Sequence, residues 1–91
     1  MKDISLINSS FTAIEAKQVL VSLLDFKIQF HNQKILSSFE KHGIEDEYSK
    51  KRIEELKKER EKVVELLDNT DLENSIIALE SDVSIKILEN A

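Results

Sequence analysis

Residues 12–43 read TAIEAKQVLVSLLDFKIQFHNQKILSSFEKHG, and this run predicts the longest helix of the chain. Thr12 and Glu15 have the spacing of a capping box, in which each side chain accepts from the other residue's backbone N–H. No Pro or Gly follows until Gly43, a residue type that commonly ends a helix in the left-handed conformation. The sequence therefore predicts a helix over about residues 13–41.

A second helix is predicted over residues 47–67, where helix-forming residues follow Asp46 as the N-cap. Helices joined by so few residues fold back into an antiparallel hairpin. The second helix has one narrow seam at alternating spacings of three and four, a heptad pattern formed by Ile53, Leu56, Arg60, Val63 and Leu67. The facing row on the first helix is Val21, Leu24, Ile28, His31 and Ile35.

The first half of the first helix carries more apolar surface than this seam can cover. Eleven of the eighteen residues from 13 to 30 are apolar, and a helix that is apolar on several sides must be buried on several sides. A chain of 91 residues with one long hairpin has little core of its own. We therefore expect self-association, most simply as a two-fold dimer that completes a helical bundle, through Val19, Leu20, Leu23, Phe26 and Phe30.

The expected fold class is mainly α, in one domain over residues 1–91. Within it, residues 1–11 form an N-terminal extension, 12–67 the helical hairpin and 68–91 an acidic C-terminal segment.

The C-terminal segment allows more than one interpretation. The capping-box spacing from Thr70 to Glu73 predicts a short third helix over about residues 71–80. Beyond it, residues 83–87 alternate with period two and predict a short strand, although they also fit a helical stripe. A lone strand needs a partner, and the candidates are residues 4–7 of the same chain or the matching segment of another copy.

Charge and composition exclude several classes of function. The formal net charge of −5 lies wholly in residues 68–91, which hold six acids and only Lys86 as a base, so no basic stripe for nucleic acid is visible. No apolar run is long enough to span a bilayer. Without Cys the chain has no disulfide, thiol nucleophile or cysteine-ligated metal. We expect a cytoplasmic protein with no cofactor, nucleic acid or membrane as a partner.

No residue pattern predicts catalysis. His31 and His42 lie eleven residues apart, about 16 Å along one helix, and cannot share a metal ion. We expect His31 to be hydrogen-bonded across the hairpin, with a pH-sensitive contact at a dimer axis as the alternative. Asp25 is expected on the solvated side of the first helix or, alternatively, in an inter-chain ion pair that fixes the register.

Two hypotheses for the function follow. The first is a non-enzymatic helical-hairpin protein that self-associates and acts through protein–protein contacts. The second is a small regulatory adaptor or inhibitor, antitoxin-like or phage-like, whose acidic C-terminal segment binds a basic partner protein. The first predicts a complete fold in the isolated chain, whereas the second predicts a C-terminal segment that orders only with its partner.

Overall fold

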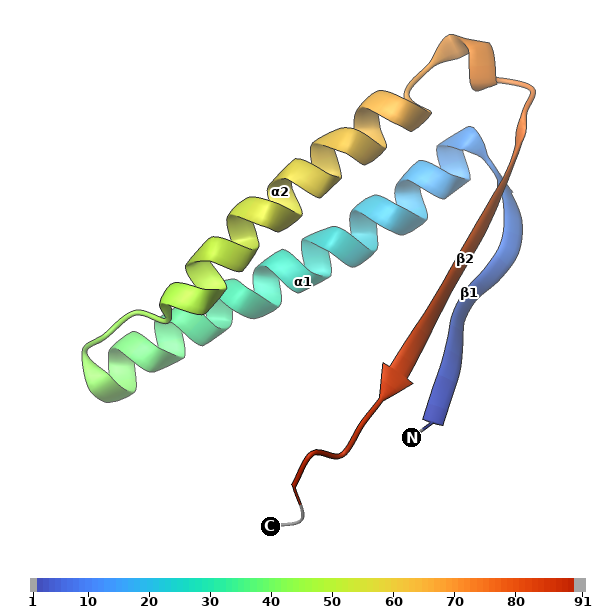
Figure 1. The fold of residues 1–91 in the computed structure, drawn as a ribbon. Helices are drawn as coiled ribbons and strands as arrows, with labels where there is room; N and C mark the ends of the chain where they lie inside the picture. Colours follow the sequence, from blue (N-terminus) through green and yellow to red (C-terminus); the bar gives the residue numbers. More distant parts are fainter. Residues whose placement is uncertain (1, 90–91) are drawn as a thin grey trace.

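The computed structural model describes residues 2–89. The chain forms β1 (Lys2–Thr12), α1 (Ala13–His42), α2 (Glu47–Leu67), a 3-10 turn (Thr70–Leu72) and β2 (Ile76–Ile85), in that order. The two helices form an antiparallel hairpin, and the two strands pair with each other beside α1 (Figure 1). Both predicted helices are confirmed, to within one residue at each end.

The helix ends have the caps that the sequence predicts. Thr12 Oγ1 accepts from the N–H of Glu15 at 3.1 Å, and Glu15 Oε1 accepts from the N–H of Thr12 at 2.9 Å. Asp46 Oδ1 accepts from the N–H of Ser49 at 3.2 Å at the start of α2. α1 ends at Gly43, whose φ of 68° lies in the left-handed region that favours glycine.

The expectation of a mainly α bundle is wrong. The described chain is 61% helical and 24% strand, which is a mixed α/β fold. β1 and β2 form an antiparallel sheet of two strands, with Ile4 opposite Val83 and Phe11 opposite Ile77. Residues 2–11, expected to be an extension, are thus half of a sheet, because their alternating apolar side chains find cross-strand partners within the same chain.

The predicted third helix over residues 71–80 is also wrong. Helical geometry covers only the 3-10 turn, where Asn69 Oδ1 accepts from the N–H of Asp71 at 2.9 Å. β2 begins at Ile76, well before the expected strand over 83–87, and ends at Ile85. Pairing with β1 decides the conformation here, because every second residue of this segment from Ile77 to Ser81 is half-buried on one side of the sheet.

The molecule is a single layer in which α1 lies between α2 and the sheet (Figure 1). Its Cα atoms extend over 51 × 30 × 14 Å, so the molecule is much thinner in one direction than in the other two. A domain is normally built from two or three packed layers. Among the described residues, the buried apolar side chains are accordingly few: Ala13, Ala16, Ile53, Leu56 and Leu67.

Candidate interaction surface

The seam between the two helices provides much of this small core. On α2 the buried members are Ile53, Leu56 and Leu67, and Val63 is half-buried. Arg60 lies at the edge of the seam, where its Nε donates to Asp25 Oδ1 on α1 at 2.8 Å. On α1, His31 is buried and the other four residues of the facing row are half-buried: Val21, Leu24, Ile28 and Ile35.

His31 is hydrogen-bonded across the hairpin to a fully buried serine. Its Nδ1 lies 2.9 Å from Ser49 Oγ, which donates to Asp46 Oδ2 at 3.2 Å. Because the hydroxyl proton goes to the carboxylate, Ser49 Oγ accepts from the Nδ1–H of the imidazole. Sequence reasoning missed Ser49, although it lies four residues before Ile53 and continues the heptad row of α2.

This Asp46–Ser49–His31 chain is structural. A catalytic triad needs an accessible hydroxyl with the imidazole between it and the carboxylate, whereas here the hydroxyl is buried between the other two groups. The N–H of Ser49 holds the pKa of the Asp46 carboxyl below its usual value of 3.8, assisted by the Ser49 hydroxyl and the charge of Lys34. Asp46 is therefore an ionised N-cap at neutral pH.

The side chains predicted for self-association differ in exposure. Val19 and Leu20 are half-buried, whereas Leu23, Phe26 and Phe30 are 37, 70 and 49% exposed. Both phenylalanines leave much of their rings in solvent, although aromatic side chains stabilise a fold or an interface most when they are buried. Three of the five side chains predicted for self-association are thus exposed in a single chain.

A continuous groove runs along α1 beside these phenylalanines. Its first part is an open cleft of about 570 Å³ between β1 and α1, lined by Leu6, Ile7, Gln18, Val19, Ser22, Leu23 and Phe26. It continues into a hollow of about 260 Å³, lined by Phe26, Gln29, Phe30 and Gln33. These ten residues are called the α1 groove below. The sequence predicted residues 4–7 as one candidate partner of the C-terminal strand, but it did not predict Leu6 and Ile7 as members of this groove.

The α1 groove is uncharged, although 34% of the chain is Asp, Glu, Lys or Arg. Its apolar side chains are bordered by amides and one hydroxyl, from Gln18, Ser22, Gln29 and Gln33. None of these groups is a general acid or base at neutral pH. One charge lies near the groove, because Lys34 Nζ is 5.8 Å from the centre of the Phe30 ring. The lining itself is uncharged, and depletion of charged residues is typical of the centre of a protein–protein interface.

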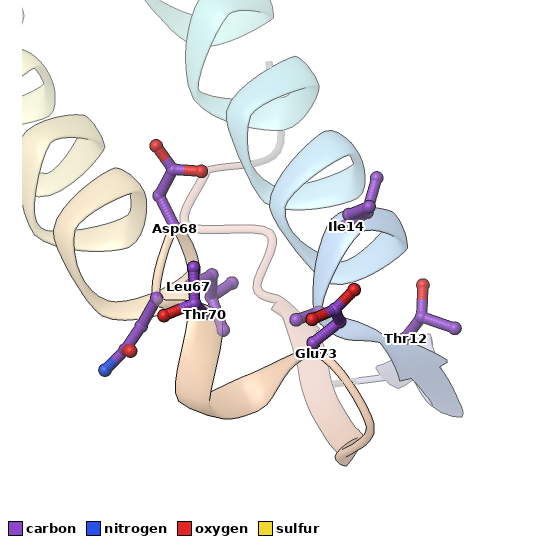
Figure 2. Close-up of a pocket in the computed structure, with 8 residues that line it drawn as sticks. Thr12, Ile14, Leu67, Asp68, Thr70 and Glu73 are labelled. Atoms are coloured by element: carbon purple, nitrogen blue, oxygen red, sulfur yellow. The ribbon is translucent and has the colours of Figure 1, made fainter.

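A separate hollow of about 400 Å³ lies where α1 begins and α2 ends (Figure 2). Its lining includes two carboxylates, of Asp68 and Glu73, and Asp68 accepts from Lys17 Nζ at 3.2 Å. It contains no His, Cys or Lys. Within residues 2–89, moreover, no group of three or more His, Cys, Asp or Glu residues could hold a metal ion. The lining of the hollow thus holds two carboxylates but no histidine, cysteine or lysine.

Comparison of the chain with protein-family models, with curated proteins and with solved protein structures found no match. Neither helix in the described part of the chain has the length and apolar character needed to cross a membrane.

Proposed function

We propose that this protein is non-enzymatic, acts in the cytoplasm through protein–protein contacts, and has a second copy of itself as its first partner. The observation that supports this most directly is the exposure of Phe26 and Phe30 along a groove that contains no charge. Single exposed apolar residues are normal on protein surfaces, but a contiguous apolar patch marks an interaction site.

The single layer supports a second copy as the occupant. Sixteen large apolar side chains are exposed in the described residues, against five apolar side chains that are buried. One broad side of the layer measures 51 by 30 Å, which is ample for the roughly 800 Å² per partner that a stable interface buries. A second layer packed on the first would give the chain the core that a domain of this size otherwise lacks.

The uncharged lining of the α1 groove also favours a second copy over a basic partner. A basic protein would find no acidic side chain in the lining to pair with, and it would be repelled by Lys34, whose Nζ lies 5.8 Å from the centre of the Phe30 ring. Two copies of this lining bring no charged lining residues against each other, and homodimer interfaces are more apolar than those of transient complexes. The groove is therefore electrostatically compatible with its own copy.

Sedimentation equilibrium at micromolar concentration tests this proposal. We expect a dimer of twice the 10.5 kDa chain mass. Phe26→Glu should give a folded monomer, because Phe26 is 70% exposed in the single chain and contributes little to its fold. Ile44→Glu is the control. Ile44 is also exposed, but it lies in the loop that connects the two helices and outside the groove. A wild-type chain that stays monomeric at 100 times these concentrations and melts cooperatively would refute self-association.

A second candidate is binding of a basic protein by the acidic C-terminal segment. Glu80 and Asp82 are exposed on the side of β2 opposite to its half-buried residues. Neither carboxylate has an ion-pair partner within residues 2–89. Replacing both with the corresponding amides should abolish capture of a basic partner and leave the dimer mass unchanged.

A further inference from the structure

The α1 groove has two unlike halves. Near the start of α1 it is a cleft whose second wall is β1, with Leu6 and Ile7 facing Val19 and Leu23. Farther along, Phe26 and Phe30 protrude, and no strand residue lines the hollow beside them. The two halves thus differ in their neighbours: β1 flanks the first half, whereas only α1 residues line the second.

We propose that the second copy docks with its α1 antiparallel, about a two-fold axis, so that Phe26 and Phe30 of each copy fill the cleft of the other. This inference rests on the self-association proposed above and specifies its geometry. The contact is isologous, because every residue pair across it occurs twice.

The spacing along α1 is suited to such packing. Val19, Leu23, Phe26, Phe30 and Gln33 recur at intervals of four, three, four and three residues. This is a second heptad row, on residues other than those that face α2, and helices with such rows pack side by side at about 20°. In the antiparallel register centred between Leu23 and Phe26, each Phe26 lies against the partner copy's Leu23, and each Phe30 against its Val19.

The position of the sheet distinguishes the two possible directions. β1 lies beside the first half of the groove, whereas no strand residue lines the second half. Parallel docking would bring two sheets to the same end and leave all four phenylalanines facing one another. Antiparallel docking places each sheet beside the second half of the groove on the other helix. It therefore covers the phenylalanines with Leu6 and Ile7, and gives β1 a role in the interface.

A distance between labels on α1 tests the direction. The chain has no Cys, so Lys41→Cys provides one site for a nitroxide label per copy. Lys41 is exposed in the last turn of α1, about 16 residues beyond the centre of the row, or roughly 25 Å at 1.5 Å per residue. Double electron–electron resonance should report about 50 Å between labels for antiparallel docking, against under about 20 Å for parallel docking.

The outcomes separate this inference from the proposed function. A dimer with the long distance between labels supports antiparallel docking. A dimer with the short distance overturns antiparallel docking but still supports self-association. A monomer overturns both.

The cleft itself is tested with Leu6→Glu, at a side chain that is 52% exposed in the single chain. It should raise the dimer dissociation constant roughly 100-fold, because an unpaired charge would be buried. Ile44→Glu should leave that constant unchanged. If Leu6→Glu dimerises like the wild type, the partner's phenylalanines do not fill the cleft, and the inference fails.

Discussion

Arg60 Nε lies 2.8 Å from Asp25 Oδ1 and joins the two helices. Arg60 interrupts the apolar seam of α2, and Asp25 interrupts the most apolar stretch of α1. The two exceptions to the apolar pattern are therefore partners. The structure pairs Asp25 within its own chain, and not across chains as one interpretation of the sequence proposed. The pair is half-exposed, with 42 and 51% of the two side chains accessible.

The exposure of this pair predicts a small coupling energy. In a double-mutant cycle with Asp25→Asn and Arg60→Gln, followed by urea unfolding, the interaction should contribute about 0.2–1 kcal/mol. It should decrease at 1 M salt, because exposed charges are screened. A salt-independent coupling above about 2 kcal/mol would show that the pair is desolvated, for example beneath another copy of the chain.

The seam of α2 predicts that substitutions at two neighbouring positions will lower the free energy of unfolding by very different amounts. Leu56 is 2% exposed, so Leu56→Ala should lower the free energy of unfolding by roughly 2–4 kcal/mol through lost transfer energy and the cavity left behind. Lys57 is exposed, and Lys57→Ala should cost under about 0.5 kcal/mol. Urea unfolding of both variants measures the difference. Equal losses would mean that the hairpin buries another face of α2.

The helices could be predicted because their signals are local. Thr12 with Glu15, Gly43 and Asp46 each define a helix end through contacts no more than four residues away. The seam positions follow from the same short periodicity. A buried hydroxyl such as that of Ser49 was harder to predict, because serine is common at exposed helix positions and only the heptad spacing indicates its place.

The sheet was predicted only in part, because its pairing joins the two ends of the chain. Residues 4–7 were one candidate partner of the C-terminal strand, and the structure pairs Ile4 with Val83, but the full length of both strands was not predicted. Thr12 pairs with Ile76, and Lys2 with Ile85, across most of the sequence. The signal was further weakened by a register shift between Ser5 and Ile7, which breaks the period-two pattern of β1. Leu6 and Ile7, the two groove members on β1, were therefore not predicted as part of the site. Of the members on α1, the sequence predicted the four apolar ones and none of the polar ones.

The sheet predicts the effect of removing the end of β2. Deleting residues 81–91 removes the partners of Lys2–Ile7 and should lower the melting temperature by several degrees, given that about 1 kcal/mol shifts a domain of this size by roughly 4–8 °C. Deleting residues 86–91 is the control, since Ile87 and Leu88 lie beyond β2 and are more than 80% exposed. Calorimetry of both truncations measures the difference, and equal melting temperatures would argue that residues 81–85 do not pair with β1.

The N-cap of α2 predicts a pH dependence. Because the N–H of Ser49 holds the pKa of Asp46 below its usual 3.8, the folded state binds this proton less readily than the unfolded chain does. The stabilisation from the ionised cap is therefore complete above the unfolded pKa near 3.8. It is lost as the pH falls below that value and through the lower, folded pKa.

Asp46→Asn isolates this contribution, because Asn is an equally good N-cap and does not titrate. Between pH 7 and pH 3 the melting temperature of the wild type should fall further than that of Asp46→Asn. All other carboxylates titrate in both proteins, so the difference between the two decreases reports on Asp46 alone. Amide exchange at Ser49 gives a local measurement, and its N–H should lose more protection in the wild type at pH 3 than in the variant. Parallel decreases in both measurements would show that the Asp46 carboxylate does not stabilise the start of α2 through its charge.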